Sequence, residues 1–193
     1  MTNPIALLMA ALALSAAPAA GFAAEADTNL ALFGKDPGTA AAYACYVRHY
    51  DPAHLAAHPK QNVRDMLLFV NSYVDSDSGR QYMLGMGVTF RKIKTMFQVD
   101  GGCGSSEDGK GALNCGIDCD GGRIDVSVKD KDAILVSIPD GARTWDPESE
   151  DDPPPGARFG DDDKLFRLDR TALTDCLPIV GDDEVKAAIS ASQ

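Results

Sequence analysis

Hydrophobic and polar residues alternate through most of the chain between Arg80 and Ile138. Apolar side chains recur at every second position, and polar residues or glycines occupy most of the positions between them. The alternating runs are 82–90, 93–99, 113–119, 124–128 and 134–138. Because successive side chains of a β-strand point to opposite faces, this period predicts strands with one buried and one solvated face. A helical period fits none of these runs.

Short polar turns join the runs to one another. The segments 119–122, 129–132 and 139–142 contain glycine, aspartate or both, and these residues favour tight hairpin turns. Connections this short join antiparallel neighbours. A meander of hairpins with one apolar face is stable as a closed barrel or as a two-layered sandwich. We therefore predict a mainly β fold, an antiparallel meander closing into a small barrel of about eight strands, with a β-sandwich as the alternative.

Longer alternating runs flank this meander. The run 62–74 is followed by the polar turn 75–79, and residues 164–170 supply the expected closing strand. Bulky side chains occupy the inward positions, which predicts a packed lumen rather than a ligand cavity. These inward residues are Tyr82, Leu84, Met86, Phe90, Phe97 and Phe166.

Two short helices are expected outside the strands. Asp51 and Pro52 are typical of the N-cap and the first position of a helix. We predict a short N-terminal helix from Pro52 to Ala57, which ends before Pro59. A second short helix, amphipathic or frayed, is expected within 182–192 at the C-terminus.

The first 23 residues carry no charge and consist mostly of alanine and leucine. They contain an apolar stretch followed by small-x-small patterns at 21–23 and 24–26, which is typical of a cleaved signal peptide. A retained membrane anchor is the alternative, but Pro18 and Gly21 interrupt the segment and shorten its apolar part below the ~20 residues of a span. We expect a periplasmic or secreted protein with no stable membrane insertion after cleavage. The predicted divisions are a signal peptide 1–23, a flexible arm 24–42, a single all-β domain 43–178 and a tail 179–193.

All five cysteines follow the predicted signal peptide. Cysteines in an exported chain favour disulfides. Cys45 and Cys176 bracket the β domain, so a bond between them ties its first strand to its last. We expect Cys45 to pair with Cys176 and Cys103 with Cys115, which leaves Cys119 free. The alternative pairs Cys103 with Cys119.

The chain has three histidines, and all of them lie between 49 and 58. His54 and His58 are four residues apart and share one face of the predicted helix, a spacing that lets two imidazoles bind one metal ion. Asp51 or His49 is the candidate third ligand. The sequence therefore keeps a zinc or copper site open as an alternative, and otherwise predicts no cofactor.

Two other metal patterns are weaker. Cys115 and Cys119 lie in strand-like sequence without a histidine nearby, which disfavours a zinc site. Asp118, Asp120 and Asp125 do not have the spacing of an EF-hand loop and lack its closing glutamate, so we interpret them as a solvated turn.

An acidic, proline-rich loop is predicted over 146–163. It contains eight acidic residues and one basic residue, Arg158, and so accounts for seven of the eleven net negative charges. Three consecutive prolines and the density of like charge disfavour packing, so we expect a mobile excursion. The acidic residues are candidates for contacting a partner. They are Asp146, Glu148, Glu150, Asp151, Asp152, Asp161, Asp162 and Asp163.

Composition and motifs favour a binding protein over an enzyme. There is no Gly-x-Ser-x-Gly stretch, and any histidine-based mechanism would have to centre on 49–58. A net charge of −11 repels nucleic acid and favours basic proteins as partners. We expect a monomeric, exported β-barrel that binds a basic protein through its acidic loop, with periplasmic zinc or copper binding by His54 and His58 as the alternative.

Overall fold

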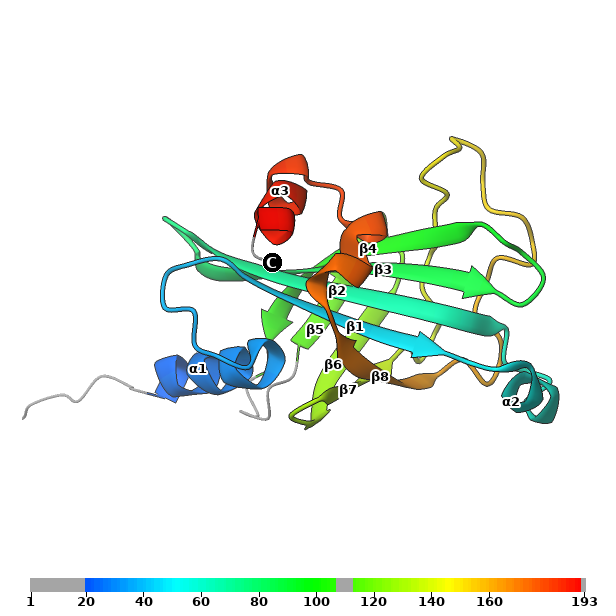
Figure 1. The fold of residues 1–193 in the computed structure, drawn as a ribbon, viewed down its shortest axis with the longest axis horizontal. Coiled ribbons are helices and arrows are strands. Elements are labelled where there is room, and N and C mark those ends of the chain that lie inside the picture. Colours follow the sequence, from blue (N-terminus) through cyan, green and yellow to red (C-terminus); the bar gives the residue numbers. More distant parts are fainter. Residues whose placement is uncertain (1–19, 107–112, 192–193) are drawn as a thin grey trace, which may run out of the picture.

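The computed structural model describes residues 20–106 and 113–191. Eight antiparallel strands follow one another round a closed barrel, each paired with its neighbours in the chain (Figure 1). This confirms the predicted mainly β fold and the barrel rather than the sandwich. The strands are β1 (Ala42–His49), β2 (Val63–Asp75), β3 (Gly79–Phe90), β4 (Met96–Ser105), β5 (Leu113–Ile117), β6 (Arg123–Asp130), β7 (Ala133–Ser137) and β8 (Leu165–Thr171). The helices are α1 (Ala20–Phe33), α2 (Pro52–Ala57), the 3-10 helix η1 (Leu173–Ile179) and α3 (Asp183–Ala191).

The barrel closes where the first strand meets the last. Only three residue pairs join β1 to β8, whereas β2 and β3 pair along almost their full lengths. Cys45 of β1 faces Thr171 of β8 in this seam, and Cys45 also forms a disulfide with Cys176 of η1. The disulfide therefore fastens the chain covalently beside its shortest strand pairing.

Large apolar side chains fill the lumen, as the alternation predicts. The inward residues of all eight strands belong to one buried cluster. Aromatic rings occupy much of the space, and Phe90 contacts both Phe97 and Phe159 with ring centroids 5.9 Å apart. The fully buried side chains include Tyr46, Phe90, Phe97, Phe166, Met66, Leu84 and Met86.

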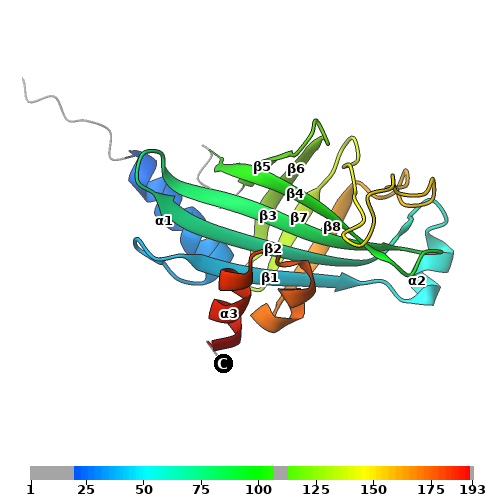
Figure 2. The ribbon, with the colours of Figure 1, turned by 90° about the horizontal axis from the view of Figure 1, so that it is seen from above.

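The N-terminal segment 24–42 is not the loose arm that its polar composition suggests. Helix α1 occupies 20–33 and, in both views, lies at the end of the barrel opposite α2 (Figures 1 and 2). The Tyr46 hydroxyl and the Arg170 guanidinium donate to the carbonyl of Leu32 at 2.7 and 2.9 Å. The Tyr82 hydroxyl donates to Oδ1 of Asn29 at 2.9 Å, inside the protein. These contacts fix α1 against the barrel.

A smaller apolar cluster lies outside the barrel wall. Helix η1 packs there against β1 and β2, and α3 packs against η1, with Ile179 and Ile189 buried. Gly87 of β3 makes this approach possible, because a Cβ at that position would lie 2.6 Å from Cγ2 of Ile179. The predicted C-terminal helix is thus present, and the residues before it contribute to the core.

Both disulfides join the cysteines that the sequence favours. Cys45 is bonded to Cys176, and Cys103 is bonded to Cys115 across the paired strands β4 and β5. Cys119 is free and exposed. No helix in the described part of the chain is long and apolar enough to span a membrane.

Candidate functional site

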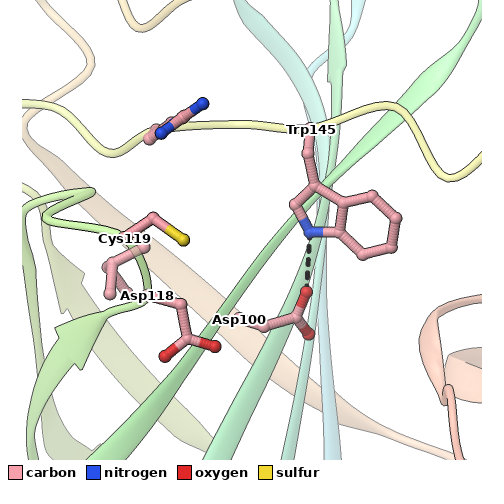
Figure 3. Close-up of a pocket in the computed structure, with 6 residues that line it drawn as sticks. Asp100, Asp118, Cys119 and Trp145 are labelled. Atoms are coloured by element: carbon pink, nitrogen blue, oxygen red, sulfur yellow. Dashed lines mark hydrogen bonds between the residues drawn. The ribbon is translucent and has the colours of Figure 1, made fainter. Parts of the chain in front are cut away.

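A pocket of about 350 Å³ opens on the outside of the barrel between β4, the β5–β6 turn and the segment that follows β7. The side chains of Asp100, Asp118, Cys119 and Trp145 face the same space (Figure 3). Ile117 and Arg143 also line it. The pocket therefore combines one large aromatic surface with two carboxylates, a thiol and a guanidinium.

Trp145 is exposed but firmly held. Its backbone exchanges two hydrogen bonds with Gln98 of β4, at 2.8 and 2.9 Å. Its indole N–H donates to Oδ2 of Asp100 at 2.7 Å, yet the side chain remains 45% exposed. A large ring that is exposed and already immobilised loses little conformational entropy on binding, which is a property of binding hot spots.

The carboxyl of Asp100 is half-buried beside this ring. Burial raises the pKa of Asp100 above its ordinary value of 3.8, and the negative charge of Asp118 raises it further. The hydrogen bond from Trp145 acts in the opposite direction by stabilising the carboxylate. Asp100 thus fixes the indole in place while its own charge is disfavoured.

The β5–β6 turn presents Cys119 in an unusual backbone conformation. Cys119 and Asp120 both have a φ of 56°, in the left-handed region that residues with a side chain rarely adopt. Gly121 follows, and a Cβ there would lie 2.7 Å from Cγ2 of Ile117. The N–H of Arg143 bonds the carbonyl of Gly121 at 2.8 Å, so the turn and the strand-like segment at 142–145 hold each other.

The lining residues suit non-covalent recognition. The carboxylates and the guanidinium of Arg143 can form ion pairs and hydrogen bonds with a partner, and the indole offers a flat apolar surface. The two carboxylates and Arg143 leave a net charge of −1 when all three are ionised. Sequence analysis identified Cys119 as a free thiol but missed the pocket, because Trp145 and Asp100 are 45 residues apart.

The acidic loop begins beside this pocket, at the residue after Trp145. Most of the acids proposed for partner binding are exposed, and Asp146 is half-buried. The exposed ones are Glu148, Glu150, Asp151, Asp152, Asp161 and Asp162.

Asp163 is a correction to the predicted binding set. It is 0% exposed, and its carboxylate accepts hydrogen bonds from the backbone N–H groups of Asn62, Val63 and Gly160. Burial raises the pKa of Asp163, while these N–H donors and the charge of Arg91 lower it. Asp163 therefore anchors the loop to the barrel and does not face a partner.

The second half of the loop packs, contrary to the expectation of a freely projecting excursion. Phe159 contacts Phe90 and Phe166, and Ala157 is buried. The Asn62 side-chain amide donates to the carbonyls of Gly156 and Arg158 at 2.8 and 2.7 Å. The residues 147–152, with four acidic side chains, thus stay in solvent, whereas Phe159 and the buried carboxylate of Asp163 fix 156–163.

The histidines lie around α2, and the structure places His54 beside His58 while the candidate third ligands contact other groups. The rings of His54 and His58 stack with centroids 4.4 Å apart, and Nε2 of His54 is 3.0 Å from Oε1 of Gln61. Asp51 caps α2 by accepting from the N–H of His54, and His49 contacts Asp65. In 20–106 and 113–191, no three His, Cys, Asp or Glu side chains are grouped so that they could hold a metal ion. Zinc or copper binding by His54 and His58 stays a prediction.

Comparison with known proteins gives no relative for this chain. No family model, no curated protein and no solved structure matches it.

Proposed function

We propose that the protein is an exported binding protein that engages a basic protein partner. The contact surface is the Trp145 face, defined as the pocket lined by Trp145, Asp100 and Asp118 together with the exposed acids of 146–152. The observation that carries this proposal is the immobilised, half-exposed ring of Trp145 at the start of the acidic loop. The two disulfides, which favour an oxidising compartment, support export.

The two parts of the Trp145 face have different roles. A few hot-spot residues dominate the free energy of binding in protein interfaces, tryptophan is enriched among them, and its ring face also attracts a lysine or arginine side chain. The pocket alone carries little net charge, because Arg143 offsets one of its two carboxylates. The acids of 146–152 therefore supply the long-range attraction, which raises the association rate and makes it sensitive to salt.

The test is capture of partners by the immobilised mature chain from an extract of exported proteins of the source cells. We expect a protein of high isoelectric point to be retained at low salt and released at high salt. Trp145→Ala should abolish retention, and neutralising the loop should weaken it mainly through the association rate. The loop variant is Glu148→Gln, Glu150→Gln, Asp151→Asn and Asp152→Asn. The matched control, which removes the same charge elsewhere on the surface, is Asp77→Asn, Asp132→Asn, Asp183→Asn and Glu184→Gln.

The control variant shows whether loss of retention comes from the acids of the Trp145 face or from the change in net charge alone. If the loop variant and the control variant lose retention equally, net charge alone governs binding and the Trp145 face is not the site. Retention that survives both Trp145→Ala and the loop variant would contradict the proposal outright.

A further inference from the structure

A second pocket, of about 470 Å³, lies near α2, where the start of β2, the β3–β4 turn and the loop before β8 meet. Its charged and amide side chains are mostly basic, in a chain whose net charge is −11. They belong to Lys60, Gln61, Asn62, Arg91, Lys92 and Arg158. Four cations thus surround one cavity of a strongly acidic protein.

Carboxylates compensate these cations poorly. Within the described residues, Arg91, Lys92 and Arg158 form no salt bridge within 4.0 Å. Lys60 has one, to Asp161 at 3.8 Å, and both side chains are more than two-thirds exposed. An exposed pair of this kind contributes little, because solvent screens it. The charge of Arg91 lowers the pKa of the buried Asp163, but the oxygens of Asp163 accept hydrogen bonds from backbone N–H groups and form no salt bridge with Arg91 among the described residues.

Arg91 is held rigidly without losing its charge. Its Nε donates to the carbonyl of Gln61 and its Nη2 to that of Leu55, each at 2.5 Å, and Nη2 also donates to the carbonyl of His58. Neutral carbonyl acceptors fix a guanidinium without neutralising it. A cation fixed before a ligand arrives costs little entropy to use in binding.

The packed half of the acidic loop brings Arg158 to the same pocket. The Asn62 amide donates to the carbonyls of Gly156 and Arg158, so the backbone on both sides of Ala157 is fixed against the start of β2. Arg158 is exposed, and its side chain makes no hydrogen bond in the part of the chain that the structure describes. Its guanidinium therefore remains available for a ligand.

We propose that this pocket binds a small anion through a phosphate or carboxylate group. Arginine and lysine form charge-assisted hydrogen bonds with both groups, and the volume lies within the range of small-molecule sites. A long polyanion is disfavoured, because the exposed Asp161 lies 3.8 Å from Lys60 of the pocket and the net charge of −11 repels it. The site is independent of the Trp145 face, which it adjoins only through the loop.

The probes are inorganic phosphate and citrate, titrated into the full chain at low ionic strength by calorimetry. Lys92→Gln with Arg158→Gln removes two exposed cations, and the control, Lys129→Gln with Lys131→Gln, removes two exposed cations from the end of β6 and the turn after it. We expect the pocket variant to bind at least about tenfold more weakly and the control to bind as the unaltered chain does. Binding of phosphate alone or of citrate alone identifies the anion class.

Amide chemical-shift mapping on the unaltered chain gives a test that needs no substitution. Shifts should concentrate at residues 60–62, 91–92 and 156–158. Absence of binding by both probes, equal binding by the two variants, or shifts elsewhere would overturn the proposal. Binding of heparin without binding of phosphate or citrate would also overturn it, since that result indicates a surface for polyanions.

Discussion

The backbone N–H of Asn62 donates to Oδ2 of Asp163, a residue 101 positions later in the chain, across 2.8 Å. The same carboxylate accepts from the N–H groups of Val63 at 3.1 Å and Gly160 at 2.7 Å. One buried side chain therefore joins the first residues of β2 to the end of the acidic loop. The basic pocket depends on this contact, because residues on both sides of it, Asn62 and Arg158, line the pocket.

Asp163→Ala should destabilise the protein markedly. The substitution leaves three backbone donors without their acceptor, and each buried, unsatisfied donor costs about 1–3 kcal/mol. We expect the free energy of unfolding in urea to fall by at least about 3 kcal/mol. Asp163→Asn keeps one acceptor oxygen and should lose less. Equal stability of Asp163→Ala and the unaltered chain would show that the loop does not depend on this contact.

Asp100 should make stability depend on acid pH in a defined direction. Its folded pKa is raised above 3.8, so the folded state bears the cost of burying the charge at neutral pH and is relieved as pH falls toward 3.8. Asp100→Asn keeps an oxygen for the Trp145 indole without the charge. Its stability relative to the unaltered chain should therefore be greatest near neutral pH and decline through this window.

The measurement is urea unfolding of both proteins at neutral pH and below the unfolded-state pKa of the carboxyl, together with an NMR titration of Asp100. A midpoint at or below 3.8 would contradict the assignment. A stability difference that grows as pH falls would contradict it as well.

The two disulfides should contribute different amounts to the free energy of unfolding. Their sequence separations are 131 residues for Cys45–Cys176 and 12 residues for Cys103–Cys115. Loop-closure entropy predicts losses of roughly 5 kcal/mol for the long loop and roughly 3 kcal/mol for the short one. Paired Cys→Ala variants, compared by urea unfolding, test the order. A larger loss for the short loop would show that chain entropy does not dominate.

Truncation distinguishes the predicted signal peptide from the part of α1 that packs. Among the residues of α1 whose side chains the structure describes, those that are buried begin at Thr28. A chain that begins at Asp27 keeps all of these buried residues and serves as the reference. A chain that begins at Gly34 loses the buried Leu32 and the contacts of Asn29, and should lose at least about 3 kcal/mol. Equal stability of these two chains would mean that α1 is dispensable.

The barrel could be predicted from sequence because its determinants are local. Alternation assigns each strand one buried face. The glycines and aspartates form short turns, and short turns join antiparallel neighbours. The same pattern placed Cys103, Cys115 and Cys119 on one face and left two pairings open, and the register of β4 on β5, which sets Cys103 opposite Cys115, decides between them.

Helix α1 was missed because the predicted signal peptide boundary falls inside it. Two of its buried residues, Thr28 and Asn29, are polar, so the spacing of apolar residues did not indicate the helix either. Asp163 and the pair Trp145–Asp100 had no comparable signal. Their roles depend on segments far apart in sequence that meet only after the barrel closes.

The narrow seam between β1 and β8 has a consequence for biogenesis. Translation delivers β1 early and β8 near the end, so a growing chain carries two unpaired strand edges for most of its synthesis. Such edges are templates for association with other chains. Pairing of β8 with β1 removes both edges at once, and the bond between Cys45 and Cys176 can form only after the last strand of the barrel has been made.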